Sequence, residues 1–185
     1  NLAINVSGSQ TSVQFLSTQH FASLSVADAS VVLAADGTRL INTGTLSITG
    51  GGTLDLKDND MIVRSGAVGT WGGSDYNGIT QLIRAGRNGG AWNGNGILTS
   101  MPAALAFRAR TTLGVSSASS ALNISPGATA VWNGQTISGT AVLVKYTYMG
   151  DSTLDGRING DDYFRIDAAY PMQTFGYANG DYDYN

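Results

Sequence analysis

The sequence predicts a mainly β protein whose body is a short β-solenoid or a β-sandwich, followed by a turn-rich segment and a short helix. Apolar residues make up 42% of the 185 residues and alternate with polar residues in short bursts, as in strands buried on one face. All 13 acidic residues are aspartate, and Lys57 and Lys145 are the only lysines, so strong helix formers are scarce. The 25 glycines suit strands joined by tight turns.

Charge and composition exclude several classes of protein. A net charge of −3 with scattered arginines provides no basic surface for nucleic acid. Cysteine is absent, which rules out disulfides and thiolate metal sites but not secretion. No stretch is long and apolar enough for a membrane span, and no signal peptide is visible. Because the first residue is Asn rather than Met, we expect a mature part of a longer precursor.

Residues 2–63 carry a repeated strand pattern. Ser23-Leu24-Ser25-Val26 recurs as Thr45-Leu46-Ser47-Ile48, so that position 45 corresponds to position 23, and Leu54 likewise corresponds to Leu33. A spacing of this size fits one coil of a β-solenoid, in which each coil stacks its apolar residues on the next. Hairpins of similar length in a β-sandwich give the same pattern, so both folds remain open.

Residues 66–96 form a polar, glycine-rich region with one apolar run. Ile79–Arg84 has helical spacing, with Asn77 as a suitable N-cap and Gly86 as a suitable end, which predicts a short helix. The tryptophans of this region have two interpretations: they form a carbohydrate-binding face, or they pin an irregular loop onto the core. These candidate glycan contacts are Trp71 and Trp92.

The second half of the chain contains three further predicted strands. Pro102 opens either a short helix or a crossing segment. Strands are expected at 111–115, 130–132 and 141–148, and the last has the clearest alternation of apolar and polar residues. It leads directly into the segment that begins at residue 149.

That segment has the pattern of a twelve-residue calcium loop. Counting from Asp151, oxygen-bearing side chains fall at alternate positions, and Gly156 occupies position six, where the chain turns sharply. Ile158 is expected to face away from the ion and anchor the loop to the core, and a short helix is expected at Asp161–Tyr170. The predicted calcium ligands are Asp151, Thr153, Asp155, the carbonyl of Arg157, Asn159 and Asp162.

A second, partial copy of the loop follows. Gly180-Asp181-Tyr182-Asp183-Tyr184-Asn185 repeats the opening of the first loop, with Asp181 in the place of Asp151, and stops before the glycine. Its candidate metal ligands are Asp181, Asp183 and Asn185. We therefore expect a β-rich body at residues 1–148 and a calcium-binding segment at residues 149–185.

The paired loops resemble dockerin-type calcium repeats, with Asp rather than Glu at position twelve and a helix only on the far side. Residues 142–170 look like the dockerin-like C-terminal segments of large secreted planctomycete surface proteins, where such segments follow β-rich, autotransporter-repeat-like regions. Thr153 departs from the Asn or Asp usual at position three, and the second repeat is incomplete. The resemblance implies an extracellular, calcium-dependent module, and the incomplete second repeat puts binding to a cohesin receptor in doubt.

Other chemistry-bearing residues are sparse. His20, the only histidine, lies beside an apolar strand and is interpreted as structural or surface-exposed rather than catalytic. Asp55, Asp58 and Asp60 form a turn, a second calcium site or a pair of glycosidase carboxylates. Two sequons are candidate glycosylation sites in a secreted protein, at Asn5 and Asn123.

No nucleophile–base set is visible, so we expect no enzyme activity. The favoured function is a non-catalytic extracellular structural or adhesive module that is stabilised by Ca²⁺ and assembles into a surface fibre. Its expected partners are copies of itself, another surface protein or a polysaccharide. The alternative is a dockerin-type anchoring module of a larger secreted polysaccharide-active protein.

Overall fold

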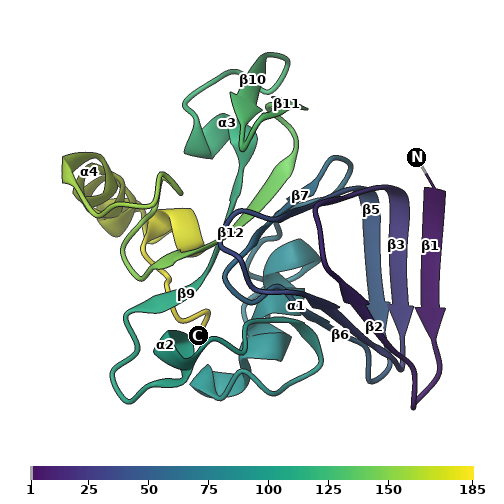
Figure 1. The fold of residues 1–185 in the computed structure, drawn as a ribbon. Helices are drawn as coiled ribbons and strands as arrows, with labels where there is room; N and C mark the ends of the chain where they lie inside the picture. The colour runs from purple at the N-terminus through teal and green to yellow at the C-terminus, as the bar shows by residue number, and fades with distance from the viewer. Residues whose placement is uncertain (1) are drawn as a thin grey trace.

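A computed structural model describes residues 2–185 and contains two large sheets (Figure 1). The first sheet has six strands and is mixed: its first four strands run parallel, and the fifth is antiparallel to both neighbours. In spatial order the strands are β1 (Leu2–Ser7), β3 (Gln19–Ala27), β5 (Leu40–Thr49), β7 (Asp60–Val63), β12 (Val142–Tyr148) and β9 (Thr111–Ser117).

The second sheet has four strands and is entirely parallel. In spatial order they are β2 (Ser12–Phe15), β4 (Ser30–Leu33), β6 (Thr53–Asp55) and β8 (Gly96–Leu98). From β1 to β7, strands that follow one another in the chain therefore lie in different sheets. A separate antiparallel hairpin is formed by β10 (Thr129–Trp132) and β11 (Gln135–Ser138).

The repeat that begins at Ser23 and again at Thr45 corresponds to strand pairing. Ser23 to Val26 of β3 lie in register beside Thr45 to Ile48 of β5. The match of Leu33 with Leu54 does not correspond to register, because Leu54 lies beside Val31 rather than Leu33. Leu24 and Val26 of β3 belong to the buried core, and Leu46 and Ile48, in register with them on β5, are partly buried against it. Each fully buried Val or Leu contributes about 1.5–3 kcal/mol.

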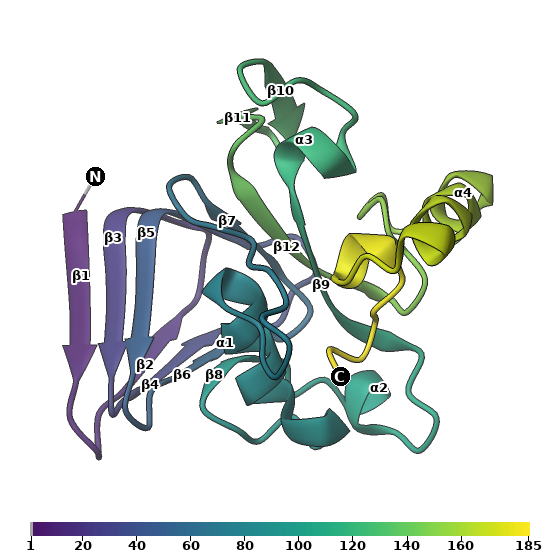
Figure 2. The ribbon, with the colours of Figure 1, turned by 180° about the vertical axis from the view of Figure 1, so that it is seen from behind.

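Residues 2–185 form four α-helices and three short 3₁₀-helices, of which α1 lies beside the sheets and α4 stands apart from them (Figure 2). Helix α1 packs against β8, and α4 follows the predicted calcium loop. No helix within residues 2–185 has the length and apolar content to cross a membrane. The helices are α1 (Gly78–Arg87), α2 (Pro102–Leu105), α3 (Ala118–Ala121) and α4 (Gly160–Ala169), with η1 (Asn88–Gly90), η2 (Tyr170–Met172) and η3 (Tyr177–Asn179).

The predicted fold class, a mainly β solenoid or sandwich, is wrong. The protein is an α/β protein with a mixed six-stranded sheet, an all-parallel four-stranded sheet and four helices. A sandwich of hairpins requires antiparallel neighbours, whereas the first four strands of each sheet are parallel. A solenoid requires its coil to continue, whereas the chain leaves β7 for α1 and returns to that edge as the antiparallel strand β12.

Several local predictions are confirmed. Helix α1 begins after Asn77 and runs one residue past Gly86, ending where Asn88 adopts a left-handed conformation. Asn77 makes no side-chain cap bond to the helix; its side-chain oxygen instead accepts from the backbone N–H of Thr70, at 2.8 Å. Pro102 opens a short helix, and the three later strands lie within two residues of their predicted bounds.

Asp60 connects three parts of the fold. Its buried carboxylate accepts hydrogen bonds from the Lys145 ammonium at 3.2 Å, from the backbone N–H of Tyr146 at 3.2 Å, and from the side-chain amide of Asn133 between β10 and β11. Burial raises the pKa of the Asp60 carboxyl above its ordinary value, although Lys145 and the hydrogen bonds oppose the rise.

This raised pKa predicts the pH dependence of stability. A folded-state pKa above the unfolded one means that the Asp60 contribution to stability is greatest at low pH and is lost as the pH rises through the folded pKa. As the pH falls through the raised pKa of Asp60 toward the ordinary carboxyl value, we expect the free energy of unfolding of the wild type to increase relative to that of Asp60→Asn. Urea denaturation of both proteins checks this, with Asp167→Asn at an exposed position as the control. Parallel pH profiles for the wild type and Asp60→Asn would contradict the expectation.

Candidate metal centre

The predicted calcium loop lies between β12 and α4. It starts with a turn in which the N–H of Asp151 donates to the carbonyl of Tyr148, at 3.1 Å. Gly156 has a φ of 89°, so the sharp turn expected at position six is present and occupies the region that favours glycine. Ile158 is half exposed, whereas Leu154 is fully buried against β9. Leu154 is therefore the residue that anchors the loop.

Asp151 is fully buried at the centre of the loop. One carboxylate oxygen accepts from the backbone N–H of Asp155 at 3.1 Å, and the other accepts from the backbone N–H of Gly156 at 2.9 Å and from the hydroxyl of Thr147. The loop backbone is thus wrapped around this carboxylate. Its position depends on β12, because Thr147 is a residue of that strand.

Asp162 is also fully buried and closes the loop from the helix side. Its two oxygens accept from the backbone N–H groups of Thr153, at 3.0 Å, and Asn159, at 2.9 Å. Asn159 caps α4 in return, so the two residues form a capping box. The hydroxyl of Thr153 lies 3.1 Å from an oxygen of Asp162 and 3.4 Å from an oxygen of Asp151, between the two carboxylates.

These two buried carboxylates have no cationic partner within residues 2–185. The salt bridges of the described chain involve other aspartates: Asp36, Asp55, Asp60 and Asp75. Burial raises the pKa of the Asp151 carboxyl above its ordinary value, hydrogen bonds from Thr147 and the loop backbone oppose the rise, and the Asp162 carboxylate adds to it. An uncompensated pair of buried carboxylates is costly unless a cation lies beside it.

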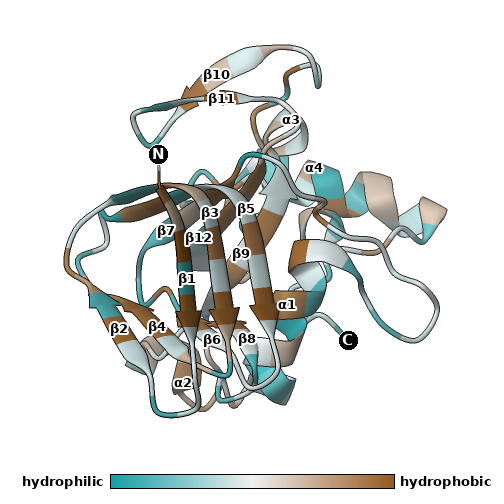
Figure 3. Cartoon of the chain, turned by 90° about the vertical axis from the view of Figure 1, so that its right-hand side faces the viewer, coloured by the Kyte–Doolittle hydropathy of each residue, from teal (hydrophilic) through white to brown (hydrophobic). Residues whose placement is uncertain are grey.

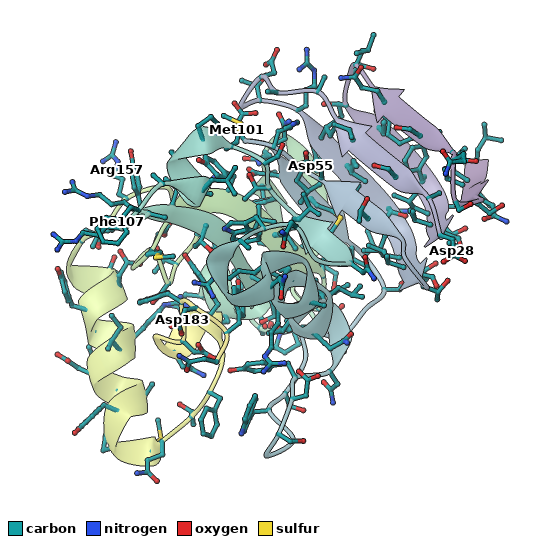
Figure 4. The ribbon with its side chains drawn as sticks, turned by 90° about the horizontal axis from the view of Figure 1, so that it is seen from below. Asp28, Asp55, Met101, Phe107, Arg157 and Asp183 are labelled. Carbon is teal, nitrogen blue, oxygen red and sulfur yellow. The ribbon has the colours of Figure 1, made fainter. Side chains whose placement is uncertain are left out.

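The other predicted ligands lie nearer to solvent. The Asp155 carboxylate accepts from the backbone N–H of Arg157 at 2.8 Å and from the side-chain amide of Asn159 at 3.3 Å. Asp155 and Arg157 are exposed and Asn159 is half-buried, and Arg157 lies at the outer margin of the molecule (Figure 4). The structure therefore brings Asp151, Thr153 and Asp162 together and places the remaining three around the rim.

The residues present fit a hard divalent cation. Within residues 2–185 no three His, Cys, Asp or Glu side chains form a metal cluster, and the buried set here is two carboxylates plus the hydroxyl of Thr153. Calcium accepts carboxylate, hydroxyl, amide and carbonyl oxygens together. Asp151, Thr153 and Asp162 would hold the ion from inside, with Asp155, Asn159 and the carbonyl of Arg157 available at the rim.

The partial second loop has different contacts. Asp181 accepts a hydrogen bond from the hydroxyl of Tyr76, and the Asp183 carboxylate accepts from the side-chain amide of Asn185 at 2.9 Å. Its backbone carbonyls are bound by helix α1: Arg87 donates to the carbonyl of Asp183 at 2.8 Å, and Arg84 donates to the carbonyl of Tyr184 at 2.9 Å. The three candidate ligands do not converge. The second loop fastens the C-terminal segment to α1, near Asp183 in Figure 4.

The two candidate glycan contacts differ in exposure. Trp92 is 3% exposed and belongs to the core, so it presents no free face to a sugar ring. Trp71 is partly buried and lies 5.1 Å from the ring of Tyr76 and 5.7 Å from that of Phe175, measured between ring centroids. The structure thus favours the interpretation in which the aromatic side chains hold an irregular loop in place.

The other candidate functional residues named from the sequence lie apart from the calcium loop. The sequon residues Asn5 and Asn123 are both exposed, as is His20. Asp55 accepts from Ser100 and pairs with the Lys57 ammonium at 3.1 Å, while Asp58 accepts from the backbone N–H of Asp36. Each of these carboxylates, and that of Asp60, therefore contacts a different segment of the chain. This fits the interpretation of the three aspartates as a structural turn.

The sequence patterns do not predict one important contact, in which aromatic residues after α4 pack onto β9. Tyr177 and Tyr184 are almost fully buried, and their ring centroids are 6.0 Å apart. The Tyr177 hydroxyl donates to the carbonyl of Tyr148 at 2.9 Å, and the Tyr184 hydroxyl donates to the carbonyl of Leu113. Only the spacing of tyrosines at 177, 182 and 184 signals this, and it does not identify their partner.

Gly114 makes this contact possible. A Cβ atom at position 114 would lie 2.6 Å from Cε1 of Tyr177 and 2.7 Å from Cδ2 of Leu154. We expect Gly114→Ala to displace both residues and to lower the free energy of unfolding by about 1–3 kcal/mol. Chemical denaturation checks this, with Gly127→Ala, whose Cβ would meet nothing within 4 Å, as the control. Equal losses in both variants would show that Gly114 is not a packing position.

No protein-family model, curated protein or solved structure matches this chain. The function proposed below therefore depends on the residues and contacts of this chain alone.

Proposed function

We propose that this chain is a non-catalytic structural or adhesive module of an extracellular surface, stabilised by Ca²⁺ in the loop at residues 151–162. The observation that supports this most directly is the pair of fully buried carboxylates, Asp151 and Asp162, with a hydroxyl between them and no cationic side chain paired with either in the described chain. A calcium ion supplies the positive charge that this arrangement lacks.

The chemistry of the donors supports calcium over softer metals. Every candidate donor is an oxygen, and neither histidine nor cysteine belongs to the set. Hard oxygen donors suit Ca²⁺, and loops of this kind in extracellular modules are tuned to the high calcium concentration outside the cell. An extracellular location is proposed on that basis.

Calcium binding would fix the position of α4 relative to β12. Asp151 is fixed to β12 through Thr147, whereas Asp162 belongs to the first turn of α4. An ion held by both carboxylates fixes the helix relative to the strand. Because an ion that binds only the folded state stabilises it by mass action, free calcium at about 100 times its dissociation constant adds about 2.7 kcal/mol.

The contacts of Asp55 and Asp60, in the β-rich body, support a non-catalytic role. Asp55 and Asp60 are buried and each has a lysine partner, at 3.1 and 3.2 Å respectively, with further hydrogen bonds to backbone or side-chain groups. A general acid or base needs a free proton position that faces substrate. These carboxylates hold the fold instead.

Calcium titration of an Asp162→Asn variant tests the proposal. The substitution keeps the side-chain shape and the acceptor for the cap of α4 but removes one of the two buried charges. We expect calcium affinity to fall by at least about tenfold, which is about 1.4 kcal/mol. Calorimetric titration measures it, and hydrogen exchange should show looser amides in residues 149–185 and unchanged ones in β3 and β5.

Asp161→Asn is the matched control, because it removes the same charge from the adjacent, exposed position. We expect its titration curve to follow that of the wild type closely. The proposal fails if the wild type does not bind calcium, or if the two variants bind it equally well.

A second candidate function is an anchoring module that docks a larger protein onto a receptor. The observation that favours it is an exposed apolar surface on α4 and η2, beside an open hollow of about 770 Å³ that Ile166 and Phe175 help to line. The exposed side chains include Tyr163, Phe164, Tyr170 and Met172.

Capture by candidate receptor domains tests the anchoring role. We expect binding to be lost in chelator and reduced severalfold in Phe164→Ser, because α4 is positioned by the loop and Phe164 is 72% exposed on it. Phe107→Ser, at a 91% exposed position before β9, is the control. Capture that persists in chelator, or that fails equally in both variants, would count against the anchoring role.

A further inference from the structure

The β10–β11 hairpin stands apart from the two sheets and is held to them by side chains (Figure 3). A two-stranded hairpin alone is only marginally stable in water. The side-chain amide of Asn42 in β5 donates to the side-chain oxygen of Gln135 at 3.2 Å, and Trp132 is 7% exposed. A further contact is made at the turn of the hairpin, where Asn133 reaches Asp60.

The turn explains why position 133 is an asparagine. Trp132 pairs with Gln135, so Asn133 and Gly134 form a two-residue turn, and both have a positive φ, of 47° and 72°. Asn-Gly is the pair of residues that such a turn favours. The turn does not explain the direction of the asparagine side chain, whose amide nitrogen donates to the Asp60 carboxylate at the start of β7.

One oxygen of Asp60 contacts both Asn133 and Lys145. The Lys145 ammonium donates to Oδ2 of Asp60 at 3.2 Å, and the amide nitrogen of Asn133 donates to the same oxygen. The side chains of Asp60 and Lys145 are 10% and 20% exposed, and the Lys145 nitrogen lies 5.7 Å from the ring centroid of Trp132. An amine, a carboxylate and a primary amide therefore meet at one partly buried place.

These are the groups that an amide bond between two side chains requires. A lysine amine attacks an amide carbon after it has lost a proton, and the nitrogen that leaves must gain one. A carboxylate in contact with both nitrogens accepts the first proton and supplies the second. Oδ2 of Asp60 has this position. Burial also raises the pKa of the Asp60 carboxyl, which favours the form that carries a proton.

We propose that Lys145 and Asn133 form an isopeptide bond, with Asp60 as the proton carrier. The Lys145 nitrogen bonds to Cγ of Asn133, the bond from Cγ to Nδ2 breaks, and ammonia leaves. Of the three protons on the Lys145 ammonium, one stays on the new amide, one reaches the departing nitrogen through Asp60, and one remains on Asp60. The step occurs once, within the chain, and consumes no other reagent.

The bond joins the hairpin turn to β12, so that a covalent link replaces contacts that open reversibly. The chain contains no cysteine, so a disulfide cannot make this connection. The inference goes beyond the calcium-stabilised role and does not rest on it, because the three residues lie outside the loop at residues 151–162. Failure of the calcium titration and failure of the cross-link test are therefore distinguishable.

Intact-mass measurement of the full chain, followed by digestion with trypsin, tests the bond. We expect the wild type to be lighter than its sequence mass by one ammonia. Trypsin cleaves after a lysine only when the side-chain amine is free, so we expect no cleavage after Lys145. Lys145→Arg keeps the charge without a reactive amine, and Asp60→Asn removes the proton carrier. Both variants should have the full mass of their sequences, and Asp60→Asn should be cleaved after Lys145.

Lys57→Arg is the matched control. Lys57 also pairs with a buried aspartate, at 3.1 Å, but that residue, Asp55, accepts a second side-chain hydrogen bond from the hydroxyl of Ser100, which has no carbonyl carbon to attack. This variant should lose one ammonia, as the wild type does.

A wild type at its full sequence mass would overturn the proposal, whether or not the variants fold. Loss of water instead of ammonia would place the bond at Asp60 and overturn it too. Loss of ammonia with normal cleavage after Lys145, or in Lys145→Arg, would indicate a succinimide at Asn133–Gly134 and not a cross-link. An Asp60→Asn variant that loses ammonia and resists cleavage after Lys145 would refute the role of Asp60.

Discussion

The structure depends on the two-sided pairing of β12. This strand is hydrogen-bonded to β7 on one edge and to β9 on the other, antiparallel to both. Val142, Leu143 and Val144 are buried on both faces, so their apolar contacts join the N-terminal parallel strands to the later part of the chain. Because β12 also carries Thr147 and leads into the loop, the same strand positions the candidate metal centre.

In this chain, which has few charged residues, buried carboxylates hold segments of the fold together. Asp55 and Asp60 each bind a lysine and a segment distant in sequence, so their charge is compensated within the described fold. Asp151 and Asp162 bind only neutral donors. The difference is one of partners rather than of burial, since all four are buried. It separates two carboxylates whose charge is compensated within the fold from the two for which we propose an external cation.

The sequence was informative where the determinants are local. The turn at Gly156, the helix after Asn77 and the pairing of Leu24 with Leu46 each follow from residues close together or from direct repetition. Alternation does not reveal whether neighbouring strands run parallel or which sheet they join, and this is why the fold class was wrong. In the loop, Leu154 rather than Ile158 is buried because its surroundings are supplied by β9 and Tyr177, which are distant in sequence.

The proposed site in the loop between β12 and α4 depends on charge. Its two buried carboxylates, Asp151 and Asp162, have no cationic partner within residues 2–185, and one is fixed to the strand and the other to the helix. Charge interactions between exposed groups weaken with salt, whereas those between buried groups are screened much less. We therefore propose that calcium, bound at this loop, controls the order of residues 149–185.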